Sequence, residues 1–340
     1  MKVTAWVPAR AGLCGNPSDG YFGRTISLAL GNFGATITVE EAERIVLEPS
    51  DRDHSVFADL ADLVEEVRYA GYYGGLRLVK ASVKRFCDHC QARGMELPAR
   101  NFRLRYRSDV PLRVGLAGSS AIVLGALSAL FRFFGVPIDA THLANLALEV
   151  ETQELAIPAG LQDRVAQAFG GLVFMDFDRE HLEEHGYGRY ERLDENLLPP
   201  LYVAYYERVG EGTEVPHADL RRRYEEGDPL VRGVMRELAE LVLDFREALE
   251  AGEVRRMEAA INRNFDLRAS IFPISGANWQ LVNTARNCGV CAKFCGSGGA
   301  IVGICEDDGQ LAELKDALDR IGAEVIRPEP GYPECRRVRQ

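Results

Sequence analysis

Residues 111–135, PLRVGLAGSSAIVLGALSALFRFFG, place a glycine- and serine-rich turn directly before an apolar helix. Gly115 and Gly118 allow the backbone to approach an anion closely, and Ser119 and Ser120 add hydroxyl groups. The free N–H groups and the positive dipole end of the helix face the same point. The stretch therefore indicates a phosphate-binding turn, although a tight turn with a serine N-cap on a buried helix would give the same pattern.

This turn is neither a P-loop nor a dinucleotide-binding motif. No Gly-Lys-Ser/Thr follows the glycines, and the GxGxxG spacing is absent. Two further segments accompany it, so that three motifs occur in order along the chain: VPARAGLCGNPSDGYFG at 7–23, VGLAGSSA at 114–121 and CGSGGA at 295–300. Together they resemble the superfamily of galactokinase, homoserine kinase, mevalonate kinase and phosphomevalonate kinase, known as the GHMP kinases.

The resemblance implies an α+β fold with two domains. The N-terminal domain is expected to be ribosomal-S5-like and the C-terminal domain ferredoxin-like, with the active site in the cleft between them. A charged stretch at 178–196 followed by Pro199-Pro200 places the boundary, giving domains 1–196 and 197–340. Within the superfamily, NPSDGYFG and AGLQDRVAQAFGGLVFMDF (159–177) look most like sugar kinases of the glucuronokinase type.

Composition agrees with a soluble enzyme. A chain of 340 residues that is 46% hydrophobic can form two cores. Its net charge of −11 argues against nucleic acid or an anionic membrane surface as partner. No signal-peptide pattern is present, and no run reaches the roughly 18 apolar residues of a membrane span. We therefore expect a cytoplasmic protein with a small-molecule partner, while the oligomeric state stays open.

The eight cysteines include Cys87-x-x-Cys90 and a second group at 288, 291 and 295. About 200 residues separate the two groups, whereas zinc modules place their pairs much closer. We expect reduced thiols that serve as small hydrophobic side chains.

Hydrophobic periodicity predicts alternating strands and helices. An N-terminal β region with a hairpin is expected, in which Gly-Asn-Phe-Gly at 31–34 interrupts the strand-like stretch 25–40. Further strands are expected at 102–106, 172–177, 201–206, 300–305 and 323–327. Helices are expected at 56–93 with a break at 71–75, and at 121–134, 143–150, 161–169, 229–250, 253–270, 277–287 and 310–321. Residues 207–228 read as a polar loop that is solvated or covers the substrate.

Asp163 is the candidate catalytic residue. It falls in the first turn of a predicted helix, where the dipole favours an ionised carboxylate that can accept a hydroxyl proton. Acidic residues favour helix N-termini for structural reasons as well, so the family resemblance carries this assignment. The same resemblance places a cation, Arg10, near Asp163 and the transferring phosphate.

For ATP and Mg²⁺ the resemblance again supplies the residues. Mg²⁺ prefers oxygen ligands, and the resemblance points to Glu151 with the Ser120 hydroxyl. Glu154 is the alternative, because it shares the apolar stripe of its helix with Glu151. A salt bridge at the helix end is the structural alternative for either glutamate. The expected ATP-binding residues are Gly115, Leu116, Ala117, Gly118, Ser119, Ser120 and Ala121.

The sugar is expected at the first and third motifs. Asp19 matches the acidic sugar-binding position of the family, but Asn16-Pro17-Ser18 replaces the Glu-His-Thr of galactokinases, which makes galactose doubtful. A uronic acid would need a cation for its carboxylate, for which three arginines are candidates. The expected substrate-binding residues are Asp19, Gly20, Arg24, Arg164, Arg268, Gly296, Ser297, Gly298 and Gly299.

These observations predict an ATP- and Mg²⁺-dependent kinase that phosphorylates the anomeric hydroxyl of a sugar, with glucuronate as the favoured acceptor. A heptose or neutral hexose kinase on the same fold is the second hypothesis, and a catalytically silent sugar sensor is the third.

Overall fold

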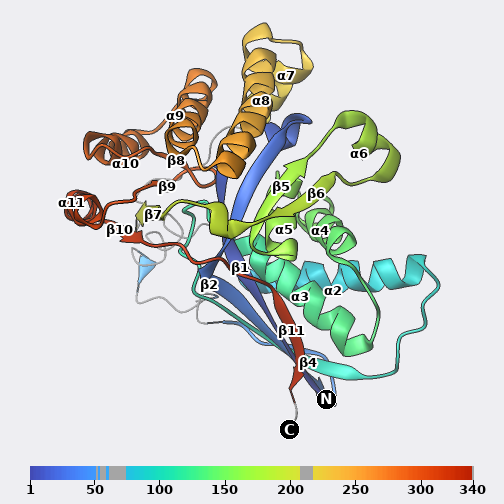
Figure 1. Ribbon diagram of the computed structural model, residues 1–340. Coiled ribbons are helices and arrows are strands. Elements are labelled where there is room, and N and C mark those ends of the chain that lie inside the picture. Colours follow the sequence, from blue (N-terminus) through green and yellow to red (C-terminus); the bar gives the residue numbers. More distant parts are fainter. Residues whose placement is uncertain (51–52, 54–58, 61–73, 207–216, 339–340) are drawn as a thin grey trace.

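The computed structural model describes residues 1–50, 53, 59–60, 74–206 and 217–338. Two sheets, each covered by helices, form the molecule (Figure 1). The first sheet has strand order β11-β1-β2-β4-β3, and β5 pairs with both β2 and β6. Its strands are β1 (Lys2–Cys14), β2 (Arg24–Ala42), β3 (Val46–Leu47), β4 (Asn101–Ser108), β5 (Leu172–Asp176), β6 (Arg189–Leu193) and β11 (Glu334–Val338).

The helices of this first unit follow from their apolar stripes. They are α2 (Gly75–Ala92), α3 (Gly118–Phe134), α4 (Ala140–Glu149), α5 (Leu161–Phe169) and α6 (Arg179–His185), and a π-helical segment, η2, covers Val150–Glu154. Helix α3 is buried nearly all round, as its continuous apolar run requires, and packs between β1 and α2. Figure 1 shows α2, α3 and α4 gathered on one side of the sheet.

The second sheet has the order β10-β7-β9-β8 and is antiparallel throughout. Its strands are β7 (Leu201–Tyr206), β8 (Lys293–Phe294), β9 (Ala300–Ile304) and β10 (Ala323–Ile326). The helices are α7 (His217–Glu225), α8 (Pro229–Ala251), α9 (Val254–Ile271), α10 (Gly276–Asn287) and α11 (Asp308–Asp319). Strand, helices, two strands, helix and strand follow one another, which is the element order of a ferredoxin-like unit.

A shared core joins the two units. One buried cluster includes Ala9 and Leu172 of the first sheet, Val203 and Val302 of the second, and Phe245 of α8. The C-terminal strand β11 also returns to pair with β1, so the last residues of the chain belong to the first sheet. The division into domains 1–196 and 197–340 stays a prediction. Strand pairing with β1 places residues 334–338 in the sheet of the N-terminal unit.

Most predicted elements form, and the differences have local causes. The expected hairpin exists as β1 paired antiparallel with β2, but the break at 31–34 is no turn: β2 continues through it, and the register shifts there between Pro8 and Ala9. The expected helix at 56–93 is described only from Gly75, and most of its first part lies outside the described residues. The prediction of a polar loop at 207–228 is wrong for residues 217–225, which form α7, whereas residues 207–216 lie outside the described residues.

The charged boundary stretch at 178–196 likewise holds α6 and β6. All eight cysteines are free thiols in the described ranges, and five of them are buried. Within the same ranges, no helix is both long and apolar enough to cross a membrane.

Candidate active site

Arg10 lies at the centre of the candidate site. It is buried on β1, and its Nε and Nη2 contact Asp163 Oδ1 at 2.7 and 2.5 Å. Its Nη1 donates to the carbonyl oxygens of Gly115, at 2.8 Å, and Cys295, at 2.9 Å. One guanidinium therefore connects the first, second and third sequence motifs with α5.

Asp163 occupies the first turn of α5, as the sequence predicts. A second arginine, Arg164, places its Nη1 3.4 Å from the other carboxylate oxygen, Oδ2. Two cations and the positive end of the helix dipole thus favour a negative charge at this position. The Asp163 side chain remains 24% exposed, so a ligand hydroxyl can reach it.

Asp19 faces the same helix end. It lies on a 3-10 turn, η1 (Ser18–Tyr21), and its Oδ2 would be only 2.5 Å from a Cβ at Gly160, the residue before α5. Only glycine at 160 permits this approach. Burial and the charge of Asp163 raise the pKa of Asp19 to about 6. The structure therefore brings Asp19, Asp163 and Arg10 together.

The second and third motifs pack directly against each other. A Cβ at Gly115, where φ is +72°, would lie 2.9 Å from both Ser297 N and Gly298 O. A Cβ at Gly296 would lie 2.3 Å from Gly115 O and 2.9 Å from Arg10 Nη1. Both glycines are therefore needed for contact between the two motifs, in addition to any contact with a ligand.

The start of α3 has no serine cap. Ala117 is the N-cap residue, in the left-handed region at φ 63°, and no side-chain cap bond is made at this end of the described helix. The Ser120 hydroxyl instead contacts Ala117 O, at 3.1 Å, and Gln167 Oε1, at 2.7 Å, while Ser119 is exposed. The alternative of a serine N-cap is wrong, and the first N–H groups of α3 stay available to an anion.

Glu151 is almost fully buried and forms an ion pair with Arg164, whose Nε and Nη2 both contact Oε2. Glu154, the alternative, pairs with Lys84 at 2.9 Å. The Ser120 and Glu151 side chains contact α5 at positions 167 and 164, which lie on one face of the helix. Oxygen ligands of this kind suit a hard cation, but the described residues contain no group of three or more His, Cys, Asp or Glu side chains that could hold a metal ion.

The three arginines proposed for a uronate carboxylate are all engaged by the protein. Arg24 pairs with Asp176 at 3.0 Å, and Arg164 with Glu151. Arg268 is buried and donates to the third motif, through Nη1 to Gly296 O at 2.7 Å and Nη2 to Ser297 O at 3.1 Å. Burial lowers the pKa of Arg268 to about 10. Arg268 thus supports the glycine loop.

Sequence reasoning missed the buried polar residues that hold the motifs in place. Gln167 Nε2 donates to Pro8 O and Ala117 O, both at 2.9 Å. Lys293 Nζ donates to Gly12 O and Asn16 Oδ1, both at 2.6 Å, and to Phe294 O at 2.8 Å. Burial lowers the pKa of Lys293 to about 7.

Two asparagines act in the same way. Asn264 Oδ1 accepts from Gly15 N at 2.6 Å, and Asn278 Oδ1 accepts from Gly299 N at 2.9 Å. The only sequence signal was a polar residue inside an apolar helical pattern, which does not reveal its partner.

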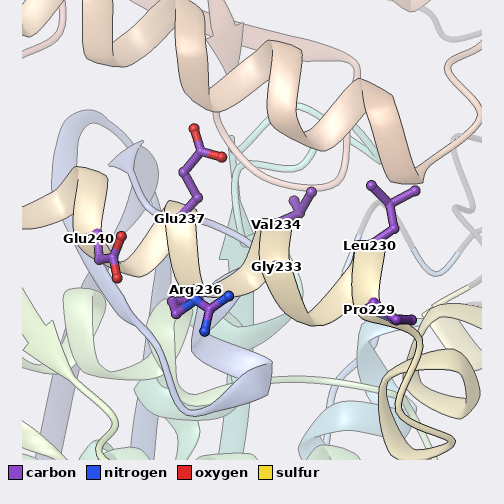
Figure 2. Close-up of a pocket in the computed structure, with 7 residues that line it drawn as sticks. All are labelled: Pro229, Leu230, Gly233, Val234, Arg236, Glu237 and Glu240. Atoms are coloured by element: carbon purple, nitrogen blue, oxygen red, sulfur yellow. The ribbon is translucent and has the colours of Figure 1, made fainter.

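A surface hollow of about 490 Å³ lies along α8, away from these residues. Figure 2 shows that Leu230, Val234 and Glu237 project to one side of the helix and Arg236 and Glu240 to the other. None of the predicted site residues lines it, so it is not the candidate site.

Comparisons with known proteins identify the family of the chain. Residues 77–171 match the model of the GHMP kinases N-terminal domain, and residues 245–324 match the model of the GHMP kinases C-terminal domain. The chain is 42% identical to "Probable glucuronokinase 2" of Arabidopsis thaliana, over 94% of this chain and 89% of that protein. The chain belongs to the GHMP kinase family. As a member of this family it is a kinase, with ATP as the implied phosphoryl donor.

Two further similarities support the assignment. "Glucuronokinase 1" of Arabidopsis thaliana is 39% identical over 96% of this chain and 91% of its own length. Lactococcus lactis galactokinase, solved in complex with galactose, has the same fold, with a TM-score of 0.77 at 16% identity over 98% of this chain and 94% of that one. The two-domain GHMP kinase fold predicted from the three motifs is confirmed.

Proposed function

We propose that this protein phosphorylates the anomeric hydroxyl of D-glucuronate with ATP and Mg²⁺, giving glucuronate 1-phosphate. Similarity to two glucuronokinases over nearly the whole chain supports the sugar. The single structural observation behind the proposal is the carboxylate of Asp163, held between Arg10 and Arg164 and facing Asp19 at the N-terminus of α5.

Asp163 is the proposed base. Its carboxylate accepts the proton of the anomeric hydroxyl while that oxygen bonds to the γ-phosphorus of ATP and the bond from the γ-phosphorus to the bridging oxygen breaks. ADP leaves with the bridging oxygen, and the proton passes from Asp163 to solvent. Arg10 bonds to one oxygen of Asp163 and so fixes the orientation of the carboxylate toward the sugar hydroxyl. Its positive charge also offsets negative charge on the phosphoryl group.

The turn Gly115–Ala121 is the proposed binding site for the phosphates of ATP. Its helix carries no side-chain cap in the described structure, which leaves N–H donors and the dipole for the anion. Ser120 and Glu151 are the proposed Mg²⁺ ligands, and the ion would offset charge on the transferred phosphate. Glu151 Oε1, which takes neither of the Arg164 bonds, is the oxygen suited to this role.

Asp19 is proposed to accept hydrogen bonds from sugar hydroxyls, since an ionised carboxylate is an acceptor at both oxygens. Gly20 directly follows Asp19 on η1, and the loop Gly296–Gly299 packs against Gly115 and Arg10, so both are proposed to border the sugar.

An ADP-release assay with a panel of free sugars tests the function. We expect turnover with glucuronate, and a product whose phosphorus resonance is coupled to the anomeric proton. Turnover with heptoses or neutral hexoses in place of glucuronate would select the second hypothesis. Sugar binding without any ADP release would contradict the kinase assignment itself.

A further inference from the structure

An acidic sugar brings a negative charge into a site that already holds two carboxylates, Asp19 and Asp163. The carboxylate of a hexuronate is attached to C5, beyond the ring oxygen from C1, so it lies several ångströms from the hydroxyl that Asp163 would deprotonate. Repulsion from both aspartates also directs it away from the α5 end of the site. A cation on the side of the site away from α5 would offset this charge.

The buried arginines of the site do not supply this cation. Arg10, Arg164 and Arg268 are each less than 6% exposed, and protein carbonyl or carboxylate oxygens accept hydrogen bonds from all three, although the buried Nε of Arg268 has no partner among the described residues. Moving any of them to a ligand would leave buried carbonyl or carboxylate groups without a donor, at about 1–3 kcal/mol for each group. They form the floor of the site.

Arg221, on α7, is placed differently. Its Nη2 lies 3.3 Å from Gly20 O, the residue after Asp19, and its guanidinium lies 5.6 Å from the centre of the Tyr21 ring. The side chain is 59% exposed, and its ion pair with Glu225 is long, at 3.9 Å. Such a pair at the surface contributes little, so the guanidinium can turn to a ligand at small cost.

The backbone that carries Arg221 is firmly attached to the first motif. Leu220 is buried in a cluster with Tyr21 and residues of α8 and α9. The Tyr224 ring packs against the Tyr21 ring at 4.8 Å, and its hydroxyl donates to Tyr21 O at 3.4 Å. Arg221 and Tyr224 are three residues apart and thus share a face of α7. That face is directed at Gly20 and Tyr21, which follow Asp19 in the chain.

We infer that Arg221 binds the carboxylate of the acidic sugar and gives the enzyme its preference for a uronic acid over the neutral sugar. This inference rests on the proposed function. A guanidinium offers paired N–H donors that match both oxygens of a carboxylate, which a neutral sugar lacks. Arg221 is then a specificity residue that lies apart from the phosphoryl-transfer chemistry.

Steady-state kinetics with two matched substrates test the inference. D-glucuronate and D-glucuronamide differ in charge and hardly in shape, so their ratio of kcat/KM isolates recognition of the carboxylate. In Arg221→Ala we expect kcat/KM for glucuronate to fall about 10- to 100-fold, mainly through KM, because a charge-assisted hydrogen bond is lost. Activity with glucuronamide should stay within about threefold of wild type, and Arg221→Lys should recover part of the loss.

Arg222→Ala is the matched control. Arg222 is the neighbouring arginine of α7 and equally exposed, but it pairs with Asp219 on its own helix and with Glu226, the residue after the helix. Its replacement should leave both substrates unaffected. The inference is overturned if Arg221→Ala keeps the wild-type preference, or if it loses activity equally with both substrates. A wild-type enzyme that does not phosphorylate glucuronate overturns the proposed function, and this inference falls with it.

Discussion

Asp163→Asn separates the chemical role of Asp163 from its structural one. The asparagine Oδ1 can still accept from Arg10, which contacts Asp163 Oδ1 at 2.7 Å in the native site. The amide is no base, however, so the anomeric hydroxyl loses its proton acceptor. We expect kcat to fall about 10²- to 10⁴-fold, the usual contribution of a general base, with a small change in KM for the sugar.

The variant should also be less stable, by an amount that the contacts set. Two charge-assisted bonds from Arg10 become neutral acceptor bonds, and an amide replaces the oxygen that lies 3.4 Å from Arg164. A loss of about 1.5–3 kcal/mol is expected. With an unfolding entropy of about 2.1 cal/mol/K per residue over 340 residues, this lowers the melting temperature by about 2–4 °C.

The assay is ADP release at 25 °C and saturating glucuronate, with calorimetry on the same samples. Glu149→Gln is the control, since it weakens a part-buried arginine–carboxylate pair, with Arg85, outside the site. The control should lose stability and keep its kcat. If kcat of Asp163→Asn stays within about threefold of wild type, the assignment of Asp163 as base is wrong.

Three further predictions follow from the site. Because the pKa of Asp19 is raised to about 6, and sugar binding needs its ionised form, kcat/KM should fall about tenfold per unit as the pH drops below about 6. Asp19→Asn should lower kcat/KM at pH 7.5 and remove this decline, and an unchanged profile would refute the role. Lys293→Met removes the donor that three buried acceptors share. Urea denaturation should therefore show a loss of about 2–5 kcal/mol in the free energy of unfolding, and a loss below about 0.5 kcal/mol would contradict the proposal that Lys293 holds the motifs in place. Chelation with EDTA should abolish ADP release, and added Mg²⁺ should restore it. Glu151→Gln should raise the Mg²⁺ concentration that gives half-maximal rate. Equal Mg²⁺ dependence in the wild type and in Glu151→Gln would exclude Glu151 as a ligand.

The sequence predicted the local features of this site well. Helix α5 begins at the predicted residue, Leu161, with Asp163 in its first turn, because apolar spacing and the preceding Pro-Ala-Gly are local signals. Resemblance to the family then identified Arg10 and Asp19, which no local pattern singles out. The structure places both of them beside Asp163.

The long-range contacts could not be predicted. Arg10 contacts residues 105, 153 and 285 positions away in the chain, and the partners of Gln167 lie 47, 50 and 159 positions away. A buried polar side chain needs a hydrogen-bond partner, but its own type does not reveal which backbone group supplies it. For the same reason, sequence alone could not rank Arg24, Arg164 and Arg268 as ligands for a carboxylate, whereas the structure shows that each of them contacts protein groups.

The glycines of the second motif show how one pattern can meet two physical demands. At sequence level Gly115 and Gly118 are equivalent, because both could admit a phosphate. In the structure the space beside Gly115 is filled by the third motif, whereas a Cβ at Gly118 would meet only Val110, at 3.3 Å. The exposed Ser119 follows Gly118 at the uncapped start of α3. Contact between the motifs therefore explains Gly115, and within the proposed turn Gly115–Ala121 we expect the anion to contact the segment from Gly118 onward, where the helix N–H groups begin.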